Sequence, residues 1–174
     1  MINLIKCTDS DISLEFLESL WDEAYPLIQA ERQRMGDEKL KEALFNLTGC
    51  PVIKYEVNGY PVGICSYTPI TALNKTYMFH RHPLYRADSN GSRSWWYSEE
   101  FQQKNSEYVR NEGFAGLISL FNESDAASNA VLNHFGSFGK YYSPPVIIKP
   151  ADIGLHLHED AKSLKMFRLD LMDN

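Results

Sequence analysis

A run of small and polar residues, positions 87–92, has the composition of a loop that binds phosphate groups. It follows a strand-like run at residues 76–79 and precedes a segment that favours a helix. The backbone N–H groups of such a loop and the first free N–H groups of a helix point at an anion, and the helix dipole adds to the attraction. Small residues matter because a large side chain would hold the phosphate away from the backbone. Residues 80–91 are therefore the first candidate for chemistry.

Two histidines at the start of this stretch are candidates for a general base. His80 and His82 are two apart, so on a strand their side chains would point to the same face. An imidazole near its ordinary pKa can accept a proton at neutral pH. Glu123, just after the apolar run 117–121, is the other candidate base. The alternative interpretation is structural: partly buried imidazoles, and a solvated strand-end carboxylate or helix cap.

The same histidines belong to a possible metal site. His80 and His82 could join His156, His158 and Glu159 if the two strands were neighbours, because alternate positions on a strand aim both rings one way. The two pairs are far apart in the sequence, and no other ligand spacing supports them. We therefore predict no metal, and interpret the second pair as alternation in a surface strand.

The elements that must position these residues follow from periodicity and from turn and cap signals. Strands are expected at residues 2–7, 52–57, 60–68, 76–79, 117–121, 146–148 and 166–171. Helices are expected at residues 12–24, 27–35, 40–47, 94–111 and 126–135. Asn58-Gly59 is a strong signal for a hairpin turn. This order predicts one domain over residues 1–174, of the α/β class (α+β, with a mixed sheet). Three consecutive antiparallel strands are expected before the candidate loop.

Composition limits the class of protein. Hydrophobic residues make up 44% of the 174 residues and charged residues 23%, which is ordinary for a soluble globular domain. A net charge of −6 without a basic block argues against general nucleic-acid binding. No apolar run has the ~20 residues of a membrane span, and the first residues lack a signal peptide's apolar stretch. Three widely spaced cysteines predict reduced thiols and a cytoplasmic location.

The candidate loop resembles a motif of the Gcn5-related N-acetyltransferases (GNAT superfamily). This family carries an R/Q-x-x-G-x-G/A loop, often with a proline three residues before the arginine and an aromatic residue just before it. Pro83, Tyr85, Arg86 and Gly91 stand at those spacings, whereas Ser89 replaces the first motif glycine. The predicted order of elements is the GNAT order over essentially the whole chain, with a mostly antiparallel central sheet flanked by helices. The chain also resembles the divergent members of this family that bacteriophages encode.

The resemblance implies acetyl-CoA, or another acyl-CoA, as the bound cofactor. Backbone groups of Arg81 or His82 would face the thioester, because Pro83 has no N–H. The pyrophosphate would lie against the loop, with Arg86 and Arg93 as possible charge partners. The residues of that loop are Arg86, Ala87, Asp88, Ser89, Asn90, Gly91 and Ser92.

The resemblance is weakest at the general acid, which in this family is often a tyrosine on the helix after the fifth strand. Aligning the helix on Gly139 places Ser128, Val131 and Phe135 at the Asn, Ala and Tyr positions, and a phenylalanine cannot donate a proton. His134 is adjacent, about 100° round the helix, and is retained as a candidate catalytic residue.

Two classes of function remain open at this point. The first is direct transfer of an acetyl group to a primary amine in a ternary complex, with a small-molecule or protein amine as acceptor. The second is a protein that kept the fold, lost catalysis, and acts in a larger assembly, possibly of a phage. Homo-oligomers or a protein partner are compatible with both.

Overall fold

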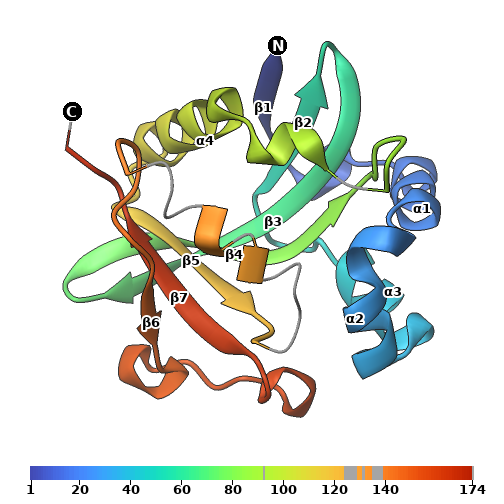
Figure 1. The fold of residues 1–174 in the computed structure, drawn as a ribbon. Helices are drawn as coiled ribbons and strands as arrows, with labels where there is room; N and C mark the ends of the chain where they lie inside the picture. The colour runs from blue at the N-terminus through green and yellow to red at the C-terminus, as the bar shows by residue number, and fades with distance from the viewer. Residues whose placement is uncertain (92, 124–128, 131, 135–138, 174) are drawn as a thin grey trace. The chain divides into compact units, whose positions relative to one another are not determined.

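A computed structural model describes residues 1–91, 93–123, 129–130, 132–134 and 139–173 (Figure 1). Its strands are β1 (Ile2–Cys7), β2 (Val52–Val57), β3 (Tyr60–Ala72), β4 (Lys75–Tyr85), β5 (Gly116–Phe121), β6 (Val146–Ile148) and β7 (Lys165–Asp170). Its α-helices are α1 (Leu14–Glu23), α2 (Tyr25–Met35), α3 (Asp37–Phe45) and α4 (Glu99–Asn111). Short 3₁₀ helices cover Asp9–Asp11, Ser94–Tyr97, Pro150–Ile153 and Glu159–Ala161. None of the helices described is long and apolar enough to cross a membrane.

The strands form a mixed sheet in the hydrogen-bonded order β1-β2-β3-β4-β5-β7-β6. The pairs β1–β2, β2–β3, β5–β7 and β6–β7 are antiparallel. Strand β5 runs parallel to β4, with Met78 opposite Leu117 and Phe79 opposite Ile118. A mixed α/β architecture with a mostly antiparallel sheet confirms the predicted fold class.

Contacts along the chain group into two compact units, Met1–Thr68 with Arg81–Phe101, and Pro69–His80 with Gln102–Asn174. Strands β3 and β4 each contribute residues to both units. The prediction of one domain over residues 1–174 stays a prediction.

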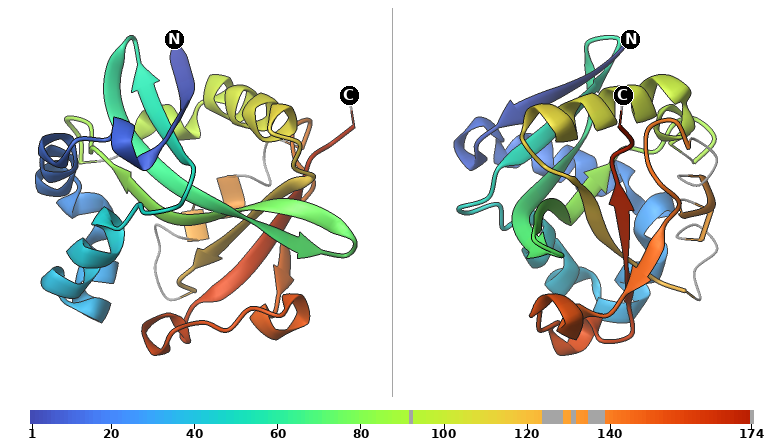
Figure 2. Two further views of the ribbon diagram at one scale, coloured as in Figure 1. Left: turned by 180° about the vertical axis from the view of Figure 1, so that it is seen from behind. Right: turned by 90° about the vertical axis from the view of Figure 1, so that its left-hand side faces the viewer.

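The first unit is built on β1, β2 and the adjoining parts of β3 and β4. Helices α1, α2 and α3 lie together in both views of Figure 2, with α2 in contact with each of the other two. The hairpin between β2 and β3 turns at Asn58 and Gly59, both with positive φ (53° and 77°), as that dipeptide predicted. The apolar core of this unit is formed by Ile12, Leu17, Leu20, Trp21, Ala24, Leu40, Leu44, Leu47, Val52, Ile64 and Leu84.

The second unit is built on the remaining part of β4 with β5, β7 and β6, which lie side by side in that order (Figure 1). Its apolar core contains Ala72, Tyr77, Phe79, Ile118 and Met166. Half of the helix predicted at residues 126–135 lies outside the described residues; positions 129–130 and 132–134 are described and are helical.

Two predicted elements around the candidate loop are wrong in extent. Strand β4 does not stop at Phe79 but continues to Tyr85, so the loop begins at Arg86. The polar run from His80 to His82 concealed this, although His80 is buried and Arg81 exposed as in any strand. The helix predicted over residues 94–111 is divided into the 3₁₀ helix Ser94–Tyr97 and α4, which starts at Glu99.

A buried tyrosine links β4 to β7 in the second unit. Tyr77 is 1% exposed, and its hydroxyl donates to Oδ1 of Asp170 at 2.5 Å. Nε of Arg168 donates to Oδ2 of the same carboxylate at 3.2 Å. Burial and then the hydrogen bond to Asp170 raise the pKa of Tyr77 to about 12, so the phenol stays protonated as a donor.

We expect Tyr77→Phe to lower the free energy of unfolding by about 1–3 kcal/mol, because it removes a buried hydrogen bond to a carboxylate. Urea denaturation measures the change. Tyr60→Phe is the control, because Tyr60 is 58% exposed. We expect this variant to lose no more than about 0.5 kcal/mol of its free energy of unfolding. Equal stability of the two variants would show that the Tyr77 hydrogen bond does not stabilise the protein.

Candidate functional site

The candidate loop, residues 86–93, leaves β4 and lies against the junction of α1 and α2. The Arg86 N–H donates to the Val62 carbonyl at 2.7 Å, and the Ala87 N–H donates to the Glu23 carbonyl at 3.4 Å. Gly91 has a φ of +70°, which a residue without Cβ adopts freely. A Cβ at Gly91 would lie 3.7 Å from Cβ of Pro26, an ordinary contact. The loop is therefore seated on the helix junction, with residues 89–91 exposed.

The side chain of Arg86, predicted as a charge partner for phosphate, is engaged by three other residues of the protein. Its guanidinium forms a short ion pair with Glu23 and donates to Ser19 Oγ at 2.9 Å. Nε donates to the Pro61 carbonyl at 3.1 Å. Each of the three guanidinium nitrogens therefore has one partner, which uses three of its five N–H donors. Arg86 therefore anchors the loop to α1 and β3.

Asp88 takes the backbone N–H groups that the sequence assigned to a phosphate. Its Oδ1 accepts from the Asn90 N–H at 2.9 Å, and its Oδ2 accepts from the Ser94 N–H at 3.2 Å. The Gly91 N–H donates to the carbonyl of Asp88 at 2.9 Å. Three N–H groups in and just after the loop are thus bound to one aspartate.

Arg93 differs from Arg86 in its surroundings. Its guanidinium lies 5.2 Å from the ring centres of both Tyr85 and Trp96, a cation–π arrangement. Where the chain is described, no carboxylate forms an ion pair with it, and it is half-buried. Arg93 is therefore a cation held in place by aromatic rings at the end of the loop.

An aromatic cluster fixes the backbone on both sides of the loop. It consists of Tyr55, Tyr85, Trp95, Trp96 and Phe101, whose ring centres are 4.4 to 6.4 Å apart. Gly63 packs so closely against this cluster that a Cβ would lie 2.4 Å from Cδ1 of Tyr85. Of the bulky residues after the loop, Trp96 is buried in this cluster and Trp95 is half-buried beside it.

Helix α4 does not offer a free N-terminus directly after the loop. A 3₁₀ helix intervenes, and Ser98 Oγ accepts from the Phe101 N–H at 3.1 Å, which caps α4. The first turn of α4 carries Glu99 and Glu100. Because these groups already complement the helix dipole, the predicted helix contribution to anion binding is weakened.

His80 is buried on β4. It is 8% exposed, and its Nε2 has no hydrogen-bond partner among the described residues. Burial lowers the pKa of His80 to about 4, so the imidazole is uncharged at neutral pH. A base of that pKa accepts a proton weakly at pH 7. The structural interpretation of His80 accounts for this environment directly.

The other predicted catalytic residues come from different segments of the chain. Glu123 lies just after β5 and pairs with Lys165 at 2.7 Å, with both side chains exposed. His134 is half-buried, and burial lowers its pKa. His82 lies on β4, but its side chain, like all of Ser92, lies outside the description. The same is true of Phe135, so the general-acid assignment stays a prediction.

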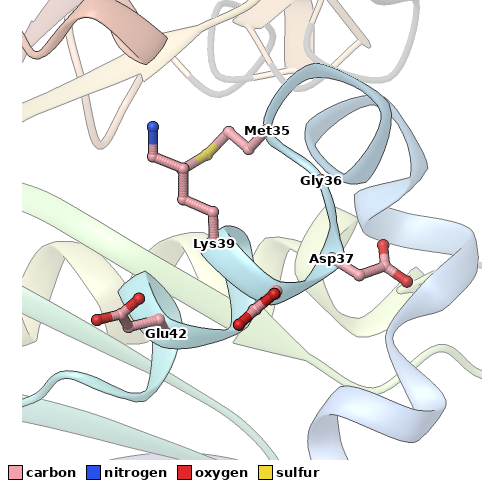
Figure 3. A pocket seen from close by; sticks show the side chains of 6 residues that line it. Met35, Gly36, Asp37, Lys39 and Glu42 are labelled. Atoms are coloured by element: carbon pink, nitrogen blue, oxygen red, sulfur yellow. The ribbon is translucent and has the colours of Figure 1, made fainter.

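A surface hollow at the turn between α2 and α3 is lined by Met35, Gly36, Asp37, Glu38, Lys39 and Glu42. The carboxylates of Asp37 and Glu42 point in different directions (Figure 3). Asp37 is moreover paired with Arg32 at 2.8 Å. Nowhere in the described part of the chain do three His, Cys, Asp or Glu side chains gather as metal ligands would. The hollow therefore offers no convergent set of polar groups.

Sequence reasoning missed the internal partners of the loop. An aspartate whose side chain bonds the backbone two residues later is a common turn motif, so the spacing of Asp88 and Asn90 was a usable signal. The pairing of Arg86 with Glu23 carries no such signal, because 63 residues separate the two.

Comparison with known proteins gives a match of fold without a match of sequence. No protein-family model matches the chain, and neither does any curated protein sequence. An acetyltransferase structure from Streptococcus agalactiae aligns over 98% of each chain, with a TM-score of 0.59 and 10% identity. An acyl-CoA N-acyltransferase from Pseudomonas aeruginosa aligns over 97% of this chain and 99% of its own, with a TM-score of 0.54 and 9% identity.

A further structure carries the family name that the loop motif suggested. An acetyltransferase of the GNAT family from Staphylococcus aureus aligns over 99% of this chain and all of its own, with a TM-score of 0.52 and 14% identity. Identities this low bear on architecture alone. The chain therefore has the GNAT acyl-CoA N-acyltransferase fold.

Proposed function

We propose that the protein is an acyl-CoA-dependent N-acyltransferase that transfers an acyl group, in the first instance acetyl, directly to a primary amine. The observation that supports this most is the likeness in fold to two acetyltransferases and an acyl-CoA N-acyltransferase from three bacteria, over at least 97% of every chain compared. The acceptor is a small-molecule or protein amine, and the protein acts in the cytoplasm. An assembly role without catalysis is the alternative that a failure to bind acyl-CoA would favour.

The loop matches an acyl-CoA diphosphate in part. Ser89, Asn90 and Gly91 are exposed, and a Cβ added at Gly91 would contact only Pro26 among the described residues outside its chain neighbours. Arg93 supplies a preorganised cation beside them. In contrast, the N–H groups of Asn90 and Ser94 are already hydrogen-bonded to Asp88, and the guanidinium of Arg86 is already paired with Glu23. We therefore assign the phosphates to the exposed loop residues and Arg93, and a structural role to Arg86.

Calorimetric titration with acetyl-CoA, and separately with CoA, tests the proposal. We expect one site per chain with micromolar affinity. Arg93→Gln should weaken binding by about tenfold, because a charge-assisted contact to phosphate is lost. Thermal unfolding of the variant checks that the aromatic cluster keeps its packing.

Lys104→Ala is the matched control, because it removes one positive charge from an exposed position on α4. It should leave the affinity within about twofold. A folded wild-type protein that binds neither acetyl-CoA nor CoA would refute the proposed function. Equal binding by wild type and Arg93→Gln would refute the assignment of Arg93.

A further inference from the structure

Two of the features that would attract an anion to the loop, its backbone N–H groups and Arg86, are already bound to carboxylates of the protein itself. The backbone N–H groups of Asn90 and Ser94 bind the two oxygens of Asp88, at 2.9 and 3.2 Å. The guanidinium of Arg86 pairs with Glu23. These are independent contacts, made by different elements, and each places a carboxylate where an anionic ligand would find its partner.

The engagement of these N–H groups has a direct chemical consequence. A backbone N–H has one proton, so it makes one strong hydrogen bond at a time. A phosphate oxygen that used the N–H of Asn90 or Ser94 would have to displace Asp88 or share its donor. It would also lie beside a second negative charge, and like charges repel.

We infer that Asp88 is an internal competitor that sets the affinity of this loop for anionic ligands. The inference rests on the proposed function, because it takes the ligand to be the diphosphate of an acyl-CoA. In the absence of ligand, Asp88 holds the loop closed on itself through Asn90 and Ser94. Binding requires the carboxylate to turn away and release both N–H groups.

A purely structural role for Asp88 makes the opposite prediction. If the aspartate only shapes the loop, its removal would make the loop less ordered. Every ligand would then bind more weakly, because ordering the loop on binding would cost entropy. If the aspartate competes, its removal frees two donors and removes a repulsive charge, and binding becomes tighter. The sign of the change in affinity therefore separates the two roles.

The experiment measures dissociation constants for inorganic pyrophosphate and for acetyl-CoA by calorimetry, using the full-length protein. Asp88→Ala should lower both dissociation constants by about tenfold. The dissociation constants of Asp88→Asn should fall between those of wild type and Asp88→Ala, because the amide oxygen still accepts one N–H but carries no charge. Amide NMR signals of Asn90 and Ser94 should shift in Asp88→Ala and shift again when pyrophosphate is added.

Asp152→Ala is the matched control, since it removes the same charge from an exposed position in the 3₁₀ helix Pro150–Ile153. Asp88→Ala that binds no more tightly than Asp152→Ala overturns the inference. If wild type binds acetyl-CoA and Asp88→Ala binds it equally, the inference fails and the proposed function stands. If Asp88→Ala gains pyrophosphate affinity while neither wild type nor any variant binds acetyl-CoA, competition between Asp88 and anions is supported, but acyl-CoA as the ligand is refuted together with the proposed function.

Discussion

Gly116→Ala is expected to destabilise the protein by at least about 3 kcal/mol, which is a large part of the stability of an ordinary domain. Gly116 begins β5 and lies opposite Asp170 of β7. A Cβ on Gly116 would lie 1.9 Å from the carbonyl oxygen of Leu169 and 3.0 Å from Cα of Asp170. Both are backbone atoms, so no change of rotamer relieves the clash, and β5 and β7 would have to separate.

The measurement is chemical denaturation followed by circular dichroism. Gly139→Ala is the control, because no atom of the described residues lies within 4 Å of a Cβ at that position. We expect the control to remain within about 0.5 kcal/mol of wild type. A Gly116→Ala protein as stable as Gly139→Ala would mean that β5 and β7 do not approach this closely.

A loss of stability on acidification is the second large effect, and we assign it to His80. Its folded-state pKa is about 4, whereas an unfolded histidine titrates near 6.5. Between these values the unfolded chain binds a proton that the folded protein excludes, so acid favours unfolding. The contribution is fully present above pH 6.5, declines as pH falls, and is lost by about pH 4. The difference in pKa corresponds to roughly 3 kcal/mol.

His80→Gln isolates this effect, because glutamine is neutral at every pH in the range. We expect the variant to lose less stability than wild type between pH 7 and pH 4, with a difference of roughly 3 kcal/mol. Urea denaturation at half-unit steps of pH measures it. The slope is the readout, so a constant packing cost of the substitution does not affect the result.

His156→Gln controls for the removal of a histidine as such, since His156 is exposed. It should reproduce the pH dependence of wild type. If His80→Gln has the same slope as His156→Gln, then His80 is accessible to protons in the folded protein. That outcome would return His80 to the list of candidate bases, because a solvent-accessible imidazole can exchange protons near neutral pH.

Local signals predicted the parts of the fold that depend on neighbours in the sequence. The limits of β2 and β6 agree with those predicted, and Asn58-Gly59 forms the expected hairpin. Pro26 stands in the first turn of α2, where its missing N–H costs nothing. Each of these depends on backbone preferences that one residue type imposes within a few positions.

The boundaries next to the candidate loop could not be read in the same way. His80 and His82 are polar, yet both lie within β4, because pairing with adjacent strands decides the end of a strand. Ser98 is a helix cap, but only the structure shows that its hydroxyl accepts from Phe101 and separates α4 from the residues before it. The irregular segment between strand and first helical turn is therefore residues 86–93 instead of 80–93, and α4 starts at Glu99 instead of at position 94.

The sequence by itself determined the order of strands and helices and the position of the small-residue loop after a strand. These follow from hydrophobic periodicity and turn residues, which act locally. Only the tertiary structure decided what the loop residues bind. Arg86 meets Glu23 from α1, and burial keeps His80 neutral. Both outcomes depend on segments distant in the chain, since packing sets the charge partners and the solvation of each group.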